Sequence, residues 1–384
     1  MNTTEPSASA GGIRWGYNGG TFLESEYQLA REKGIPLTLD ISAHSGCSNN
    51  CIYCGYLDTM KGTPLAGDEI ASMIRQFAEL GGKSFRFVGE GEPLSRKDIF
   101  QLVGEIKKSG MIPVIFSCGD LLGDDGLCLK LHGFDGGEAI GRLNEAGVTI
   151  VLKYDAHYQD HIANRPGYSE KRNRALERLM NSGFNLRAPS HLAFGTVVLK
   201  ANHEEIPELY DYGFSRNIYT VNCALMPIGR SEFDYEKLGI TGDEMIELAV
   251  KTYIIAWEYG IPFTRVADFP GGLACDISRA GFYVSYTGEI DLCEANLSED
   301  IGNFRDIPLS VAWEKINAAR ERQGDERVRG LCIAKRAKEI IPPNYDAEVT
   351  RKVQDFIRQN PERFNSRPRA VTKSMIDAYA KNRP

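Results

Sequence analysis

The chain has 384 residues, of which 42% are hydrophobic and 25% charged, with a net charge of -7. This composition excludes the hydrophobic-poor chains that stay disordered, and the acidic balance argues against a protein that binds nucleic-acid phosphates through a basic surface. No apolar run approaches the roughly 18 residues of a membrane span. The polar N-terminus lacks a signal-peptide pattern. We therefore expect a cytoplasmic protein without nucleic-acid or membrane partners, whose nine cysteines serve metal binding or catalysis rather than disulfides.

The first half of the chain alternates between strand and helix patterns. Residues 1–34 are polar and rich in glycine and serine, which predicts a flexible N-terminal extension. Residues 35–232 contain helical patterns, such as 67–80 and 204–217, between six short apolar segments. These segments predict strands at 36–42, 84–89, 112–118, 148–155, 192–199 and 219–227. Such an order indicates an α/β fold with a parallel sheet, in which functional groups collect at the carboxyl ends of the strands.

The pattern changes after residue 230. A long amphipathic helix is predicted at 242–260, and a hairpin at 281–293 turns around Thr287 and Gly288. A further helix ends the segment 301–316. We expect a second, smaller region at 233–340 and a basic helical tail at 341–384.

Three cysteines follow the first predicted strand, in the stretch "HSGCSNNCIYCGY" at Cys47, Cys51 and Cys54. A zinc site would need a fourth ligand, but neither His44 nor His157 lies at a finger-like spacing. A thioredoxin-type pair would leave Cys47 unexplained. Thiolates at this spacing can instead bind three corners of a cubane iron–sulfur cluster and leave the fourth iron open to an external ligand.

This C-x-x-x-C-x-x-C motif, with Tyr53 before its last cysteine, resembles that of the radical S-adenosylmethionine (radical SAM) enzymes. The stretch "GEGEPL" at 89–94 follows the second strand and resembles the family's Gly-Gly-Glu-Pro element, which holds the methionine ammonium of S-adenosylmethionine. The family more often has glycine at the position of Glu90. The alternative for this stretch is an ordinary turn between a strand and a helix.

The resemblance implies a partial (β/α)6 barrel with a [4Fe-4S] cluster on the three cysteines. It also implies contacts to S-adenosylmethionine from Glu90, Gly91, Glu92 and Pro93. In that family, one-electron reduction by a reductase or flavodoxin-type donor yields a 5′-deoxyadenosyl radical, which abstracts a hydrogen atom from the substrate.

Further contacts to S-adenosylmethionine are implied at the ends of the later strands. For each of these residues, a solvated polar strand end is an equally good interpretation. They are Ser117, Lys153, Asp155, Asn202 and Pro227, the last within "MPIGR".

Cys275, Cys293 and Cys332 surround and follow the predicted hairpin, in an order that resembles the SPASM/twitch extension of radical SAM enzymes over about residues 270–335. The resemblance implies a twitch-type domain with a second, auxiliary [4Fe-4S] cluster. Lys335 stands where the short form of this extension has a fourth cysteine. The auxiliary cluster would therefore have an open iron or a remote fourth ligand, and the alternative is three buried apolar cysteines.

The short twitch form resembles members that act on carbohydrates, aminocyclitols and aminoglycosides. We therefore expect epimerisation or dehydrogenation of a small, sugar-like substrate in natural-product biosynthesis. Cys223 on the sixth strand is a candidate hydrogen-atom donor for epimerisation and Cys118 a weaker one, with structural packing as the alternative for both. A maturase of ribosomally synthesised peptides remains open, as does an iron–sulfur electron-transfer or redox-sensing protein, which "GEGEPL" disfavours.

Overall fold

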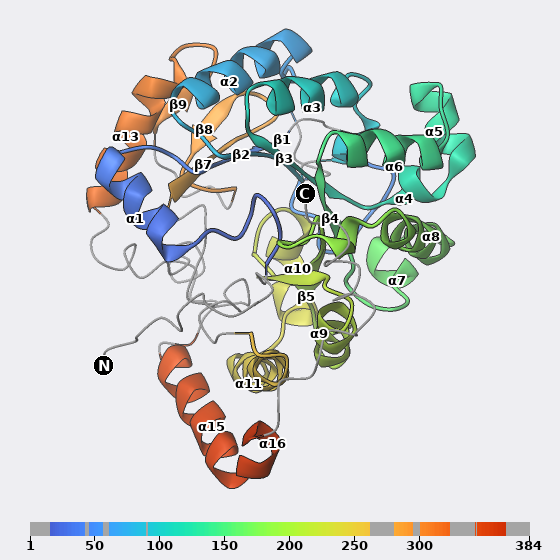
Figure 1. Cartoon of the computed structure of the whole chain (residues 1–384), viewed down its shortest axis with the longest axis vertical. Helices are drawn as coiled ribbons and strands as arrows, with labels where there is room; N and C mark the ends of the chain where they lie inside the picture. The colour runs from blue at the N-terminus through green and yellow to red at the C-terminus, as the bar shows by residue number, and fades with distance from the viewer. Residues whose placement is uncertain are drawn as a thin grey trace.

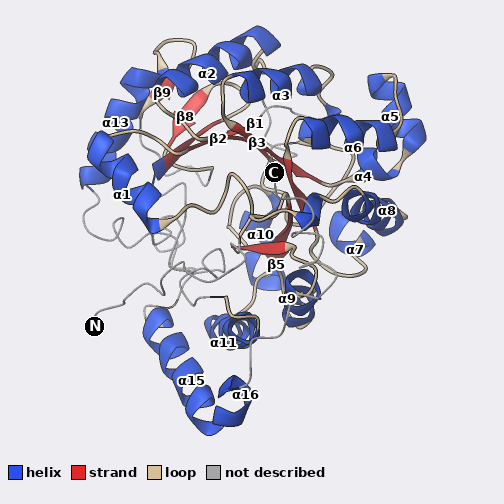
Figure 2. Cartoon of the chain, in the orientation of Figure 1, coloured by secondary structure: helices blue, strands red, loops and turns tan. Residues whose placement is uncertain are grey.

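A computed structural model describes residues 16–42, 46–56, 61–89, 91–261, 280–294, 300–322, 342 and 344–365. A curved parallel sheet forms its centre, and helices cover the outer side of this sheet (Figure 1, Figure 2). The parallel strands are β1(Thr38–Ser42), β2(Ser84–Val88), β3(Ile112–Ser117), β4(Thr149–Lys153), β5(Leu192–Val198) and β6(Tyr219–Ala224). All six lie within the predicted segments, and their ends differ from the predicted ends by at most three residues. The expected α/β class with a partial barrel is confirmed.

The helices between the strands follow the predicted alternation, with short additional turns at the strand ends. They are α2(Gly67–Glu79), α3(Ile99–Lys108), α4(Asp120–Gly123), α5(Asp125–His132), α6(Gly136–Glu145), α7(Asp160–Ala163), α8(Tyr168–Asn181) and α9(Ile206–Phe214), with the 3-10 helices η1(Pro93–Ser95) and η2(Phe184–Leu186).

Helix α2 shows how the sequence builds the outer layer. Its buried residues recur at helical spacing, at Ile70, Met73, Ile74 and Phe77. The ring of Phe77 meets Phe85 and Phe282 edge to face, with centroid distances of 6.2 and 5.9 Å. Burying one such side chain contributes about 1.5–3 kcal/mol. The sheet is therefore held from outside by an apolar layer.

The predicted hairpin extends the main sheet. Strands β7(Gly281–Val284) and β8(Glu289–Asp291) pair antiparallel, and β9(Gly302–Asn303) follows β8. Strand β7 also pairs parallel with β1, opposite Thr38 to Ile41, so the sheet order is β6-β5-β4-β3-β2-β1-β7-β8-β9. The sheet is thus continuous across the expected boundary between residues 232 and 233.

The N-terminal segment corrects one expectation. Residues 1–34 were expected to be flexible, but the described part, residues 16–34, contains helix α1(Glu24–Lys33) and a buried Tyr17, while residues 1–15 lie outside the described residues. The ring of Tyr17 lies 5.9 Å from that of Tyr219, and Ser84 donates a hydrogen bond of 2.5 Å to a carbonyl of the same segment. Aromatic burial thus anchors residues 16–22 across the amino ends of the strands, which glycine and serine content alone does not predict.

The C-terminal helices pack on the side of the barrel. The expected long helix is α11(Gly242–Glu258), and α15(Tyr345–Gln359) and α16(Pro361–Asn365) lie beside it (Figure 1). Ion pairs join α15 to α11 through Lys352 and Glu247, and α16 to α11 through Arg363 and Glu258. The remaining helices within the described residues are α10(Arg230–Leu238) and α13(Leu309–Arg322).

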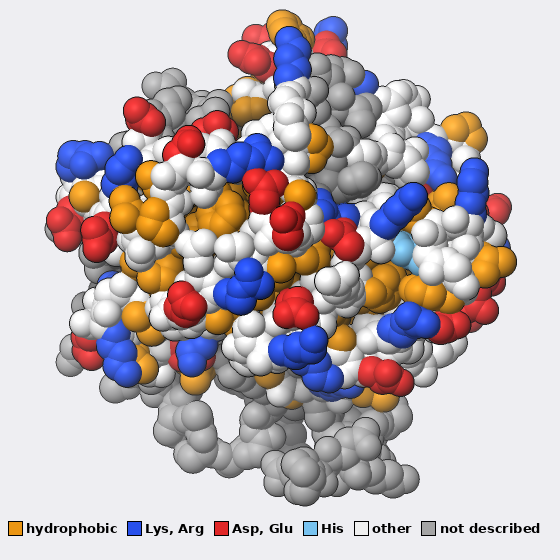
Figure 3. All heavy atoms as spheres, turned by 90° about the horizontal axis from the view of Figure 1, so that it is seen from above, with side chains coloured by type: hydrophobic (Ala, Val, Ile, Leu, Met, Phe, Trp, Pro, Cys, Tyr) orange, Lys and Arg blue, Asp and Glu red, His pale blue; other side chains and the backbone are white. Residues whose placement is uncertain are grey.

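The molecular surface agrees with the mixed composition. On the face drawn in Figure 3, acidic and basic side chains are interspersed, without a large area of one sign. Within the described part of the chain, no helix has both the length and the apolar character needed to cross a membrane.

Candidate active site

The three cysteines of the motif lie in one loop that follows β1. Cys51 is buried, Cys47 and Cys54 are half-buried, and none of the described cysteines forms a disulfide. Burial, reinforced by the charge of Glu92, raises the pKa of Cys47 to about 12, and burial also raises the pKa of Cys51. At neutral pH these thiols therefore keep their protons unless a bound cation displaces them, because metal ligation requires the thiolate form. The donor set fits an iron–sulfur cluster with three thiolate ligands.

Two neighbouring elements hold this loop through its backbone. The N–H groups of Asn50 and Ile52 each donate to a carbonyl at the end of α7, at 3.0 Å. On the other side, the N–H of Glu92 donates to the carbonyl of Gly46 at 2.7 Å. The "GEGEPL" loop and the cysteine loop therefore form one structural unit.

The loop after β6 also packs against the cysteine loop. Gly229 has a φ of 55°, and a Cβ at this position would lie 2.1 Å from the carbonyl oxygen of Gly55. The N–H of Arg230 donates to the carbonyl of Cys54 at 3.2 Å. The half-buried Pro227 thus lies in a loop that contacts the cysteine loop.

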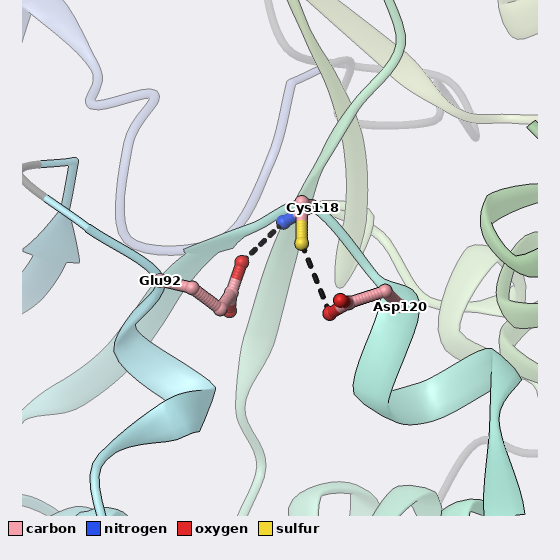
Figure 4. Close-up of side chains that lie close together, drawn as sticks. All are labelled: Glu92, Cys118 and Asp120. Atoms are coloured by element: carbon pink, nitrogen blue, oxygen red, sulfur yellow. Dashed lines mark hydrogen bonds between the residues drawn. The ribbon is translucent and has the colours of Figure 1, made fainter. Parts of the chain in front are cut away.

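Glu92 is the buried carboxylate of the "GEGEPL" loop (Figure 4). Its two oxygens accept hydrogen bonds from the N–H groups of Leu94, at 3.1 Å, and Cys118, at 2.6 Å. Burial, followed by the charge of Asp120, raises the pKa of Glu92 to about 7. The preceding Gly91 has a φ of 86°, a conformation that favours glycine. Among the described residues no cation pairs with this buried carboxylate, so it fits a cationic ligand such as an ammonium.

Asp120 stands on the other side of Cys118 from Glu92 (Figure 4). It accepts hydrogen bonds from Cys118 Sγ at 3.1 Å, from Arg165 Nη1 at 2.8 Å and from the hydroxyl of Ser48. Burial favours the neutral form of Asp120, but these hydrogen bonds outweigh it and hold the pKa of Asp120 below its usual value. The Cys118 thiol is thus buried and bonded to a carboxylate.

A second polar group lies beside the cysteine loop at the ends of β4 and β5. Asp155 is fully buried, pairs with Lys153, and accepts hydrogen bonds from the hydroxyl of Tyr53 at 3.1 Å and the N–H of Val197 at 2.9 Å. The Asn202 amide donates to the carbonyl of Asp155 at 2.7 Å. Asn202 therefore joins two strand ends. Lys153 and Tyr53 lie near the thiols of the cysteine loop. The ammonium of Lys153 and the phenol of Tyr53 each interact electrostatically with Cys51.

Toward the carboxyl ends of β4, β5 and β6, one face of the sheet is partly accessible. Cys223 is exposed, whereas the other residues of β6 are buried. Cys223 pairs with Val197 of β5. Two residues earlier in β5, Gly195 pairs with Lys153 of β4. Side chains alternate between the two faces of a strand, so Cys223 and these three partners lie on the same face of the sheet. Val197, Gly195 and Lys153 are half-buried. Cys223 therefore lies on the same wall as Lys153.

The other predicted site residues are distributed as follows. Ser117 is buried beside Glu92, and its hydroxyl accepts from the N–H of Gly119 at 2.9 Å. Pro93 begins η1 and is buried. Cys293 is half-buried just after β8. Glu90, Cys275 and Cys332 lie outside the described residues.

The structure adds residues that sequence reasoning missed. Ser48 and Asn49 lie between the cysteines and bond to Asp120 and Arg165. The only signal in the sequence was that Ser48 and Asn49 are polar residues inside the motif. Nothing in the sequence linked them to Arg165, which is more than a hundred residues away.

Comparisons with known proteins agree with this geometry. The family model described as "Radical SAM superfamily" matches residues 41–213. An AdoMet-dependent heme synthase of Methanosarcina barkeri is 24% identical, over 75% of this chain and 85% of the relative. A GTP 3′,8-cyclase of Staphylococcus haemolyticus is 28% identical over 58% of this chain, which spans 64% of the cyclase's length.

Solved structures share the fold at low sequence identity. The enzyme anSMEcpe with bound AdoMet aligns with a TM-score of 0.58 and 17% identity, over 86% of this chain and 98% of that one. SuiB of Streptococcus suis bound to S-adenosylmethionine aligns with a TM-score of 0.55 and 16% identity, over 84% and 81%. The cofactors of the superfamily are a [4Fe-4S] cluster and S-adenosylmethionine, and the three thiols and Glu92 fit them. The match to the Radical SAM superfamily model covers residues 41–213, a little under half of the chain, and over this region the chain is similar to that family.

Proposed function

We propose that this radical SAM enzyme inverts a carbon centre of a carbohydrate, aminocyclitol or aminoglycoside. The observation that supports this outcome is the exposed Cys223 thiol on the inner wall of the barrel. When bound and reduced by an external one-electron donor of the flavodoxin type, the cluster and S-adenosylmethionine supply a 5′-deoxyadenosyl radical. The remaining steps take place between that radical, the substrate and this thiol.

The chemistry that these groups would supply is the removal of a hydrogen atom from a substrate C–H bond, which would leave a carbon radical on the substrate and 5′-deoxyadenosine as the by-product. Cys223 then gives its S–H hydrogen to the opposite face of that carbon. The product is the epimer, and Cys223 is left as a thiyl radical. One electron and one proton from the external donor and solvent restore the thiol.

A sugar-like substrate is consistent with the charges near this wall. Lys153, Asp155 and Tyr53 place an ammonium, a carboxylate and a phenol at one edge of it. The net charge of -7 favours the approach of a cationic aminosugar over that of an anionic substrate.

An auxiliary [4Fe-4S] cluster at Cys275, Cys293 and Cys332 belongs to the same proposal. The hydroxyl of Tyr56, which follows the first motif, donates to the carbonyl of Glu294 at 3.0 Å. The turn that carries Cys293 therefore contacts the cysteine loop. If the substrate radical instead lost an electron to such a cluster and a proton to solvent, the product would be a dehydrogenated substrate and Cys223 would not be needed.

The test uses the anaerobically reconstituted enzyme with a panel of aminoglycosides and aminocyclitols in deuterated water. We expect the inverted carbon of the product to carry one deuterium, because a thiol exchanges its hydrogen with solvent. The Cys223→Ala variant is expected to form 5′-deoxyadenosine and to lose at least tenfold of its epimer yield. Cys128→Ala, which removes a buried thiol on α5, is the matched control. Undiminished epimer formation by Cys223→Ala would exclude this role.

A peptide substrate is the second candidate. Among the solved structures that share this fold, one is anSMEcpe with the Cp18Cys peptide and another is SuiB bound to the precursor peptide SuiA. Radical formation that depends on a peptide, with no response to the sugar panel, would favour this candidate. If no compound of either class supports 5′-deoxyadenosine formation, an iron–sulfur electron-transfer or redox-sensing protein becomes the better interpretation.

A further inference from the structure

The Asn49 side chain carries a buried donor that nothing in the described structure satisfies. Asn49 lies between Cys47 and Cys51 and is 4% exposed. Its amide nitrogen, Nδ2, has no hydrogen-bond partner among the described residues. A buried N–H without an acceptor is costly, so its presence beside a ligand-binding loop points to an acceptor that arrives with the ligand.

The orientation of this amide is determined by Arg165. Arg165 Nη1 lies 3.1 Å from Asn49 Oδ1. A guanidinium has only donors, so the amide oxygen must face Arg165 and the nitrogen must point away from it. Arg165 is held in turn by the buried Asp120, with an Nη1 to Oδ2 distance of 2.8 Å. The amide cannot turn its nitrogen toward Arg165 without losing this contact.

The Asn49 backbone points to the same neighbourhood. Its N–H lies close enough to the Cys47 sulfur to favour the thiolate form, although burial has the larger effect on the pKa of Cys47. The residue thus has one N–H directed at a ligand sulfur and a second, Nδ2, without an acceptor.

We infer that Asn49 Nδ2 donates a hydrogen bond to a sulfur of the [4Fe-4S] cluster and thereby raises its reduction potential. This inference rests on the cluster of the proposed function. One-electron reduction makes the cluster more negative, so a donor at sulfur stabilises the reduced state more than the oxidised one. Arg165 and Asp120 are positioning residues that hold the amide in this orientation.

The test is an EPR-monitored redox titration of the reconstituted full-length protein without substrate. Asn49→Leu keeps the approximate size of the side chain and removes the donor. We expect the ratio of reduced to oxidised cluster at a fixed solution potential to fall about tenfold, which is about 59 mV for a one-electron couple. Iron content should be unchanged. The relevant signal is the one that changes when S-adenosylmethionine is added.

Two further variants test the positioning role. Arg165→Met is expected to shift the potential in the same direction as Asn49→Leu, because the amide loses its orientation, whereas Arg165→Lys keeps a donor and should largely restore the wild-type value. If the Asn49→Leu protein fails to bind iron, these two Arg165 variants still test the effect of the amide on the reduction potential. Asn185→Leu is the control, since Asn185 is a buried amide near the amino ends of the strands that donates to the Arg216 carbonyl at 2.8 Å.

The outcomes separate this inference from the proposed function. An unchanged potential in fully loaded Asn49→Leu, or an equal shift in Asn185→Leu, would overturn the inference while 5′-deoxyadenosine formation continues. A wild-type protein that binds no iron would overturn both. A loaded wild-type protein that forms no 5′-deoxyadenosine would count against the proposed enzyme but not against the effect of Asn49 on the cluster potential.

Discussion

At the scale of single residues, two thiols near the site differ in their surroundings. Cys118 is buried and donates to Asp120, so its hydrogen is already used in a structural bond. Cys223 is exposed on the inner wall of the barrel. Sequence position placed both on a strand or at its end. Only the packing around them distinguishes the buried thiol from the exposed one.

His191 provides a residue-scale prediction that is independent of the cofactors. Burial, with the charge of Arg187, lowers the pKa of His191 to about 4. Its folded-state pKa is thus below the unfolded value of about 6.5. The stabilisation is present above pH 6.5 and is lost as the pH falls from about 6.5 to about 4, because the unfolded state binds the proton more readily.

We expect this loss to be on the order of 2 kcal/mol, after allowing for the partial exposure of the ring. Urea denaturation at pH 7 and pH 4.5 measures it. His191→Gln should show a smaller difference between the two pH values than the wild type. His161→Gln, on α7, is the control, and an equal pH dependence in wild type and His191→Gln would contradict the prediction.

At the scale of elements, the active-site loops are positioned by close backbone contacts. The loop after β6 meets the cysteine loop at Gly229, where a Cβ would lie 2.1 Å from the carbonyl oxygen of Gly55, so no side chain fits at Gly229. The loop after β2 meets it through Glu92 and Gly46. The geometry of the thiols therefore depends on glycines in loops that are far apart in sequence.

Gly229→Ala tests this dependence. The added Cβ would lie 2.1 Å from a backbone oxygen, and the residue has a φ of 55° and a ψ of -127°. We expect destabilisation of about 1–3 kcal/mol and lower iron uptake, because the two loops must separate. Thermal unfolding and iron analysis measure these effects.

Gly55→Ala is the matched control for that variant. Its added Cβ meets the flexible end of Ile228 at 2.8 Å, which can move at little cost. Equal iron uptake by both variants would show that the close backbone approach is not needed for the cluster.

At the scale of the whole molecule, segments from both ends of the chain complete the barrel. Residues 16–22 cross the amino ends of the strands, and β7 adds to β1. Tyr17→Ala is expected to destabilise the protein by about 3 kcal/mol, since it removes a buried aromatic ring and leaves a cavity. Urea denaturation measures this, with the exposed Leu23→Ala as control. A stability loss below that of the control would mean that this segment does not support the barrel.

The sequence by itself determined the six strands, the helices between them and the likeness of the cysteine and "GEGEPL" motifs to those of radical SAM enzymes. These features depend on local periodicity and on residues a few positions apart. The tertiary structure alone decided which polar groups meet. Asn49 with Arg165, Glu92 with Cys118, β1 with β7 and Tyr17 with Tyr219 all join segments well separated along the chain, and no local pattern records such pairings. Burial, which separates Cys118 from Cys223, likewise depends on neighbours brought together by folding.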